Sequence, residues 1–231
     1  MTKSLDLQEV AIVLQATNLD PAILNPSLFN YGAIFPTDWK ALRQPVYQRN
    51  GVQLLFKNGI SLVAQPNKIT LSELVLGKEI HELQVATLMT KWIEALPNIN
   101  YRALGINPTG MVTFSEDQHE ASNFLRSTLL TEGVRREGAP ELLKASLNLA
   151  YRLERGILNL SIQEGVAQLS EERKISALLY SGNCHYALQG ESQADRLGDL
   201  KAVLDQWQTG VEAYCDLVSQ KLLQSPELVA V

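Results

Sequence analysis

An Asn-Gly pair between two apolar stretches constrains the fold of this chain more than any other local feature. Residues 52–57 and 60–65 are rich in apolar residues, and Asn58-Gly59 separates them. Asn-Gly tolerates the positive φ angles of a type I′ turn, which matches the twist of two antiparallel strands. We therefore predict a β-hairpin, followed by a third strand from residue 69 that makes it a meander.

The segments on either side of this meander complete a unit of strand, connection, meander and helix. Residues 9–16 form a short apolar run of β-branched character, which favours a buried strand. Residues 79–96 carry apolar residues at helical spacing, and Pro97 follows them. We expect this helix to cover one face of the meander.

The second half of the chain repeats this order of elements in a looser form. We expect a strand over 101–114 broken by a turn at 107–110, a helix from 115, strands over 147–153, 158–162 and 175–180, and a helix over 192–223. Runs of strands followed by helices favour the α+β class over an alternating parallel sheet.

The predicted fold is therefore α+β, with antiparallel sheets packed against long helices. We expect a single globular unit over 1–231. Two pseudo-repeats, 1–98 and 99–231, would each hold a strand, a three-stranded meander and a helix. Chance similarity of order is the open alternative to such a duplication.

Composition limits the compartment and the partners. The 231 residues are 45% hydrophobic and 19% charged, a balance typical of a globular protein with a large core. The net charge of −5 disfavours nucleic acid, because the molecule as a whole repels phosphates. The start of the chain lacks the pattern of a signal peptide, and no apolar stretch is long enough to cross a bilayer. With only two cysteines, we expect a soluble, cytoplasmic protein with reduced thiols and no membrane partner.

Few residues stand in a pattern typical of catalysis. Cys184 and His185 are adjacent, and neighbours on a strand point to opposite faces, so they are poorly placed to form a catalytic pair. The three histidines are far apart and form no metal-binding pair on one helix. Residues 105–110 lack the lysine of a phosphate-binding loop. We predict no catalytic, cofactor or metal site, and the sequence leaves open whether Cys184 or His185 is reactive.

The proline-rich connection before the hairpin holds the candidate functional residues. Four aromatic side chains in it need a place to be buried: Phe29, Tyr31, Phe35 and Trp39. They either cover the core as a lid or anchor a partner, because aromatic side chains bury much area at a low cost in rotamer entropy. The lid is the more common outcome for such residues, and docking of a partner is the alternative.

One resemblance is carried by three stretches of this region. Residues 25–29, 34–39 and 56–61 resemble a pattern in a family of bacterial conserved hypothetical proteins. The similarity covers about the first quarter of the chain, and it implies no activity.

The sequence thus favours a non-enzymatic protein-interaction or assembly protein that self-associates. The absence of a catalytic pattern and the wealth of sheet edges and aromatic loop residues motivate this expectation. The alternative is a small-molecule binding protein or enzyme with its site between the sheet and the helices. A buried pocket with several polar groups would favour the alternative, and a flat apolar surface would favour the interaction protein.

Overall fold

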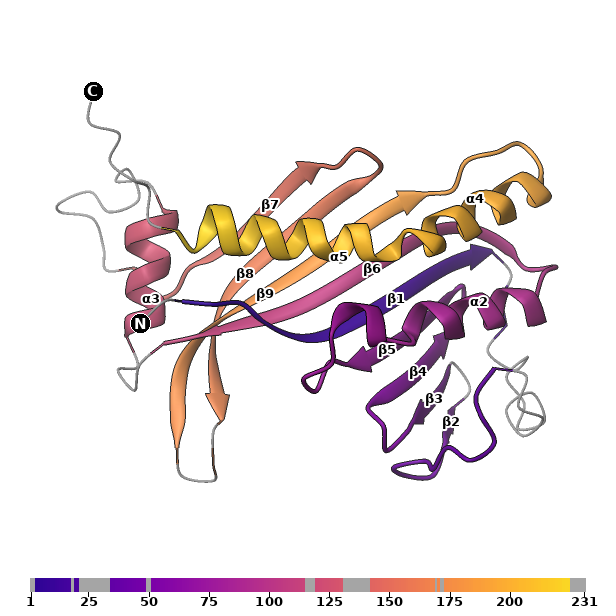
Figure 1. Cartoon of the computed structure of the whole chain (residues 1–231), viewed down its shortest axis with the longest axis horizontal. Helices are drawn as coiled ribbons and strands as arrows, with labels where there is room; N and C mark the ends of the chain where they lie inside the picture. The colour runs from indigo at the N-terminus through magenta and orange to yellow at the C-terminus, as the bar shows by residue number, and fades with distance from the viewer. Residues whose placement is uncertain are drawn as a thin grey trace.

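The fold is one antiparallel sheet with helices packed against it (Figure 1). The structure, a computed structural model, describes residues 3–17, 19–20, 34–48, 51–114, 119–130, 142–168, 170 and 173–224. The nine strands follow the order β2-β3-β4-β5-β1-β6-β9-β8-β7. The predicted α+β class is confirmed, but one continuous sheet replaces the expected separate sheets, because β1 and β6 join the two halves.

The strands are β1 (Asp6–Thr17), β2 (Val46–Gln48), β3 (Gly51–Leu55), β4 (Ile60–Gln65), β5 (Lys68–Leu74), β6 (Asn100–Thr113), β7 (Ser146–Arg152), β8 (Ile157–Gln168) and β9 (Lys174–Ala187). The α-helices described are α2 (Val85–Ala95), α3 (Glu120–Phe124), α4 (Gln193–Asp205) and α5 (Trp207–Asp216). A 3₁₀ turn, η2 (Ile80–Glu82), precedes α2, and π-helical turns follow α3 and α5 as η3 (Leu125–Leu129) and η5 (Leu217–Leu222).

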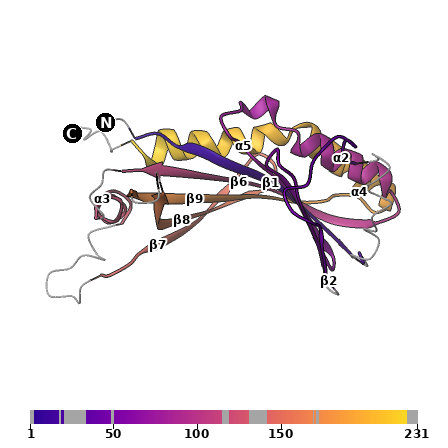
Figure 2. The same cartoon turned by 90° about the horizontal axis from the view of Figure 1, so that it is seen from below.

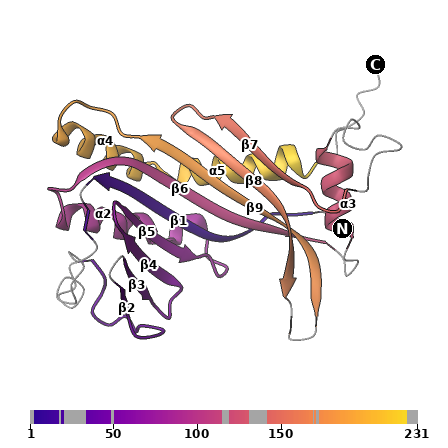
Figure 3. The same ribbon diagram turned by 180° about the vertical axis from the view of Figure 1, so that it is seen from behind.

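The main core lies between the sheet and a layer formed by α2, α4 and α5. These three helices run along one face of the sheet (Figure 2), and Figure 3 shows the strands from the other side. Helix α2 contacts β1 and β5, whereas α4 and α5 contact β6. The largest fully buried side chains include Trp92, Tyr180 and Tyr214, which lie on α2, β9 and α5. Both halves of the chain therefore contribute large aromatic residues to the core.

The strand order is symmetric about the central pair. Strands β1 and β6 pair antiparallel, and outward from them the order is β5, β4, β3 on one side and β9, β8, β7 on the other. In each half the first strand pairs with the last strand of its meander. Strand β2 has no counterpart among the described strands of the second half, so it makes the two margins of the sheet different.

The hairpin of β3 and β4 forms where the Asn-Gly pair places it, but its turn is not of type I′. Gly59 has a φ of +86°, whereas Asn58 is not among the residues with positive φ. The Gly59 N–H donates to the Phe56 carbonyl at 3.2 Å, and the Phe56 N–H donates to the Ile60 carbonyl at 2.8 Å. This is the pattern of a type I turn followed by a glycine bulge, a longer connection that also suits the strand twist.

Strand β6 continues through the turn that the sequence predicts at residues 107–110. The register with β9 places Pro108 opposite Gly182, between the pairs Ile106–Cys184 and Thr109–Ser181. A Cβ atom on Gly182 would lie 3.0 Å from the Pro108 Cγ. The missing side chain at Gly182 therefore makes room for the proline ring, and this central strand stays unbroken.

Helix α2 begins at Val85, several residues after the predicted start at residue 79. The carboxylate of Glu73, on β5, is fully buried and accepts hydrogen bonds from the backbone N–H groups of Gln84 at 2.6 Å and Val85 at 2.9 Å. Its second oxygen accepts from Lys78 Nζ at 2.8 Å. The first amides of a helix have no partner within the helix, so this carboxylate fixes where α2 starts.

The long helix expected over 192–223 is divided at Gln206. The Gln206 N–H donates to the Val203 carbonyl three residues earlier, which interrupts the i→i−4 ladder between α4 and α5. These helices have 13 and 10 residues, and α2 has 11. Leu200, Trp207 and Tyr214 are buried on both sides of the division, so the apolar stripe still packs against the sheet.

Candidate functional site

The described part of the proline-rich connection lies against the edge of the first meander. Ala41 forms a β-bridge with Phe56. The Leu42 N–H donates to the Leu55 carbonyl at 2.7 Å, and the Lys57 N–H donates to the Lys40 carbonyl at 3.0 Å. After Pro45, the chain pairs with β3 again as β2. Two short stretches of backbone pairing thus hold the connection beside β3.

Three aromatic rings meet where the connection crosses β3. The ring centroids of Phe35 and Phe56 are 4.8 Å apart, those of Trp39 and Phe56 are 5.4 Å apart, and those of Phe35 and Trp39 are 5.9 Å apart. Phe35 is buried, whereas Trp39 and Phe56 are partly exposed. Rings at these separations pack directly on one another and form a continuous apolar wall.

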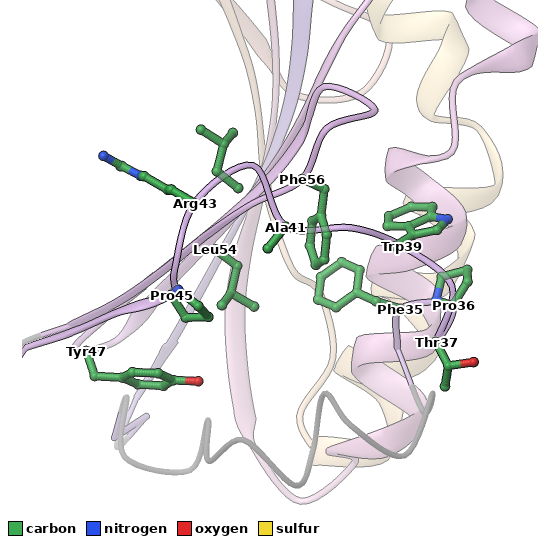
Figure 4. A pocket seen from close by; sticks show the side chains of 11 residues that line it. Phe35, Pro36, Thr37, Trp39, Ala41, Arg43, Pro45, Tyr47, Leu54 and Phe56 are labelled. Carbon is green, nitrogen blue, oxygen red and sulfur yellow. The ribbon is translucent and has the colours of Figure 1, made fainter.

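This wall borders a hollow of about 300 Å³, which we call the aromatic pocket (Figure 4). Its lining residues are Phe35, Pro36, Thr37, Trp39, Ala41, Arg43, Pro45, Tyr47, Leu54, Leu55 and Phe56. Tyr47, from β2, is 48% exposed and lies across the pocket from Trp39. The volume is at the lower end of the range for ligand sites, which suits a side chain or a short segment better than a large cofactor.

The charge around the aromatic pocket is opposite to that of the whole chain. Lys40, Arg43 and Lys57 are exposed on the segments that form the pocket, and Asp38 is the acidic side chain among them. Arg43 donates to the Gln53 side chain at 2.7 Å and points away from the rings (Figure 4). The chain as a whole carries a net charge of −5. The described segments that form the pocket therefore carry more basic than acidic side chains.

The structure brings together two of the four residues that the sequence predicts for docking. Phe35 and Trp39 line the aromatic pocket. Phe29 and Tyr31 lie outside the described residues. Sequence reasoning missed Phe56 and Tyr47, which belong to the hairpin and to β2. The aromatic character of Phe56 next to the Asn-Gly pair was the one signal that pointed to it.

A second cavity lies between the helix layer and the sheet. It has a volume of about 560 Å³ and is lined by Leu153, Glu154, Arg155, Tyr186, Val203, Gln206, Thr209, Gly210 and Ala213. Burial raises the pKa of Tyr186 to about 12, so its phenol stays neutral at physiological pH. Arg155 at the rim is paired with Asp199 on α4. This second cavity combines an apolar floor with a few polar groups.

Cys184 and His185 do not form a reactive pair. Cys184 lies on the buried face of β9 and donates from Sγ to the Gly210 carbonyl at 3.4 Å, whereas the next residue, His185, is partly exposed. Burial raises the pKa of the Cys184 thiol to about 12. Because the thiolate is the nucleophilic form, this thiol is inert in the folded protein.

Alkylation of the native protein with iodoacetamide at neutral pH is therefore expected to leave Cys184 unmodified. Cys215, whose pKa burial raises to about 11, should react slowly. Peptide mass spectrometry after native labelling, with a sample unfolded in guanidinium as the control, measures both sites. Rapid labelling of Cys184 in the folded protein would contradict this assignment.

No protein-family model matches this chain. No curated protein matches it either. The resemblance carried by residues 25–29, 34–39 and 56–61 therefore stays a prediction.

The structure also bears on membrane-spanning helices and on metal sites. Within the described part of the chain, no helix is both long and apolar enough to span a bilayer. Among the same residues, no three His, Cys, Asp or Glu side chains gather as a metal site would require.

Proposed function

We propose that this protein is a non-enzymatic interaction protein that holds an apolar side chain of a partner polypeptide in the aromatic pocket. The observation that carries the proposal is the wall of Phe35, Trp39 and Phe56 beside an open hollow of about 300 Å³. Rigid aromatic side chains around a pocket are typical anchors of protein interfaces. The two free cysteines are compatible with a reducing compartment such as the cytoplasm.

The geometry favours a peptide segment over a small cation. A cage for an alkylated ammonium group needs rings that surround the cation, whereas these rings contact one another. The excess of basic side chains on the segments that form the pocket, Lys40, Arg43 and Lys57, also disfavours a cation. The partner segment that fits best has an apolar residue for the pocket and acidic residues beside it.

The residues that line the aromatic pocket all come from the first half of the chain. We propose that the symmetric strand order reflects duplication of a unit of strand, meander and helix. In this view the pocket lies on the connection between the first strand of the first unit and its meander. Binding sites often lie on such connections, which a rigid sheet positions.

Selection of a random peptide display library on the purified protein tests the proposed binding. The expected result is enrichment of peptides with an aromatic or aliphatic residue flanked by Asp or Glu. Binding of a selected peptide is then measured by titration with fluorescence detection. Tyr47→Ala should weaken it at least tenfold, because truncation of an interface anchor commonly costs 2 kcal/mol or more, about the scale of a 30-fold loss.

The variants separate binding from folding. Tyr47 is 48% exposed, so its replacement should change stability by less than about 0.5 kcal/mol. Arg43→Glu should weaken acidic peptides most at low salt. Ile157→Ala is the matched control, because Ile157 is 47% exposed and lies on β8, far from β2 in the sheet. Selected peptides that bind both pocket variants as well as the wild type would refute the proposal.

A small-molecule binding function is the second candidate, and the second cavity supports it. Its volume of about 560 Å³ lies within the range of ligand sites, and Tyr186, Gln206 and Thr209 supply polar groups. Screening of a fragment library by ligand-observed NMR tests this function. Thr209→Trp, at an exposed position on the rim, should fill the cavity and abolish the binding of any fragment that occupies it.

A further inference from the structure

The two margins of the sheet are finished differently (Figure 1). The outer edge of β3 is covered by β2 and by residues 40–42, which hydrogen-bond to β3 and the residues after it. By its place in the strand order, β7 is the counterpart of β3. No strand in the described part of the chain pairs with the outer edge of β7 (Figure 3). Among the described residues, the backbone groups along that edge thus have no strand partner, and such an edge can pair with another strand.

Strand β7 also lacks the devices that usually protect a sheet edge. Its seven residues, Ser-Leu-Asn-Leu-Ala-Tyr-Arg, contain no proline, lysine or acidic residue, and its pairing with β8 shows no bulge. Leu147, Leu149 and Tyr151 are partly exposed and pack against the main core. A long, nearly neutral edge with a row of half-covered apolar side chains favours pairing with another chain.

We propose that a second copy of this chain occupies the edge, with its β7 antiparallel to the first β7 and a two-fold axis at Leu149. A two-fold axis perpendicular to the sheet keeps both helix layers on the same face. Residues that face each other across the two β7 strands must then point to the same side of the joined sheet. The axis therefore passes through a residue, and moving it by one residue shifts the pairing by two. The two nine-stranded sheets would become one continuous sheet.

The charges just outside the ends of β7 support this register among the three that lie closest. Lys144 precedes β7, and Glu154 lies in the turn between β7 and β8. With the axis at Leu149, the end of β7 near Lys144 comes beside the end near Glu154 of the second copy, so opposite charges lie close together on both sides of the axis. With the axis at Asn148, Lys144 would come beside Arg152 of the second copy, and like charges close together across a sheet are unfavourable. With the axis at Ala150, Glu154 would come beside the uncharged Ser146. Lys144, Arg152 and Glu154 are all exposed, so each is free to meet the second copy.

The register with the axis at Leu149 also places apolar residues of the two β7 strands opposite each other. Leu147 faces Tyr151 of the second copy on the helix side, and Leu149 meets its own equivalent at the axis. On the opposite side, Asn148 faces Ala150. Cross-strand pairs of aliphatic and aromatic side chains stabilise a sheet, so the register is self-complementary on both faces.

Sedimentation equilibrium of the full chain tests the dimer through one pair of double variants. The wild type should have twice the mass of the 25.6 kDa chain. Asn148→Lys/Ala150→Lys places two lysines opposite each other on both sides of the axis, so this variant should sediment as a monomer. Asn148→Lys/Ala150→Glu is the matched control: in this register a lysine at position 148 faces a glutamate at position 150, so the dimer should persist. Both positions are exposed, which keeps the effect on the fold of one chain small.

Each outcome decides the proposal. A monomeric wild type, or a dimer that survives in the double-lysine variant, overturns it. Loss of the dimer in both variants contradicts the register with Asn148 opposite Ala150.

Circular dichroism of both variants shows whether they are folded. If the double-lysine variant is unfolded, hydrogen exchange of the β7 amides in the wild type decides: protection that falls on dilution supports the dimer, and protection that does not change with concentration overturns it. The peptide-binding proposal does not depend on this result, since β2 and β7 lie at opposite margins of the sheet.

Discussion

Replacement of Glu73 by alanine is expected to lower the free energy of unfolding by about 2–5 kcal/mol, because two backbone N–H groups and the partly exposed Lys78 ammonium lose their acceptor. The Glu73 carboxylate is fully buried, pairs with Lys78 and accepts from two backbone amides at the start of α2. Its removal leaves those amides without an acceptor inside the core. Denaturant unfolding monitored by circular dichroism measures the loss.

The matched control for Glu73 is an exposed ion pair. Glu94 lies 3.7 Å from Lys201, and both side chains are about half exposed. Glu94→Ala should therefore lower the stability by less than about 1 kcal/mol, since exposed pairs contribute little. Equal losses for Glu73→Ala and Glu94→Ala would show that the buried carboxylate does not hold α2 in place.

Truncation of Tyr214 to alanine should lower the free energy of unfolding by about 3–5 kcal/mol, the cost of a large aromatic cavity in a core. The Tyr214 ring packs over two glycines of the sheet, because a Cβ atom on Gly182 would lie 2.8 Å from its Cδ2 and one on Gly110 would lie 3.0 Å from its hydroxyl. The hydroxyl donates to the Tyr180 carbonyl at 2.7 Å. The surrounding backbone cannot collapse readily into the space left by the ring, because it belongs to central strands.

Tyr214→Phe separates the ring from its hydroxyl. This variant keeps the packing and loses one hydrogen bond, so it should lower the stability by about 1 kcal/mol. Burial raises the pKa of Tyr214, so the folded state keeps the phenol neutral while the unfolded chain ionises near pH 10. The wild type should lose stability as the pH rises above about 10, and Tyr214→Phe should lose less over the same range. Identical pH profiles for the two proteins would contradict this role.

The elements that the sequence predicts well are those set by neighbouring residues. The hairpin around Asn58-Gly59 and the strand now seen as β1 follow from local turn and strand preferences. Two of the errors arise where a distant residue decides. Gly182, on another strand, keeps β6 continuous through Pro108, and Glu73 on β5 sets the start of α2. Neither partner can be identified from spacing along the chain.

The aromatic pocket could be predicted only in part for the same reason. The excess of aromatic residues in a proline-rich connection pointed to Phe35 and Trp39. The third ring, Phe56, joins them because Ala41 bridges to it, and Tyr47 completes the pocket because β2 pairs with β3. A sequence shows which residues are able to build a site, but the pairing of the connection with the hairpin decides which of them meet.

The central place of β1 has a consequence for synthesis on the ribosome. Strand β1 leaves the ribosome before the other strands described here, and its second neighbour, β6, begins only at Asn100. At roughly 5–20 residues per second, the ribosome needs about 4–17 s to make the intervening chain. During that time the first meander can form while the edge of β1 that later pairs with β6 has no partner. An unpaired edge of this kind favours contacts between nascent chains. Translation speed between β1 and β6 should therefore affect the yield of folded protein more than translation speed after β9.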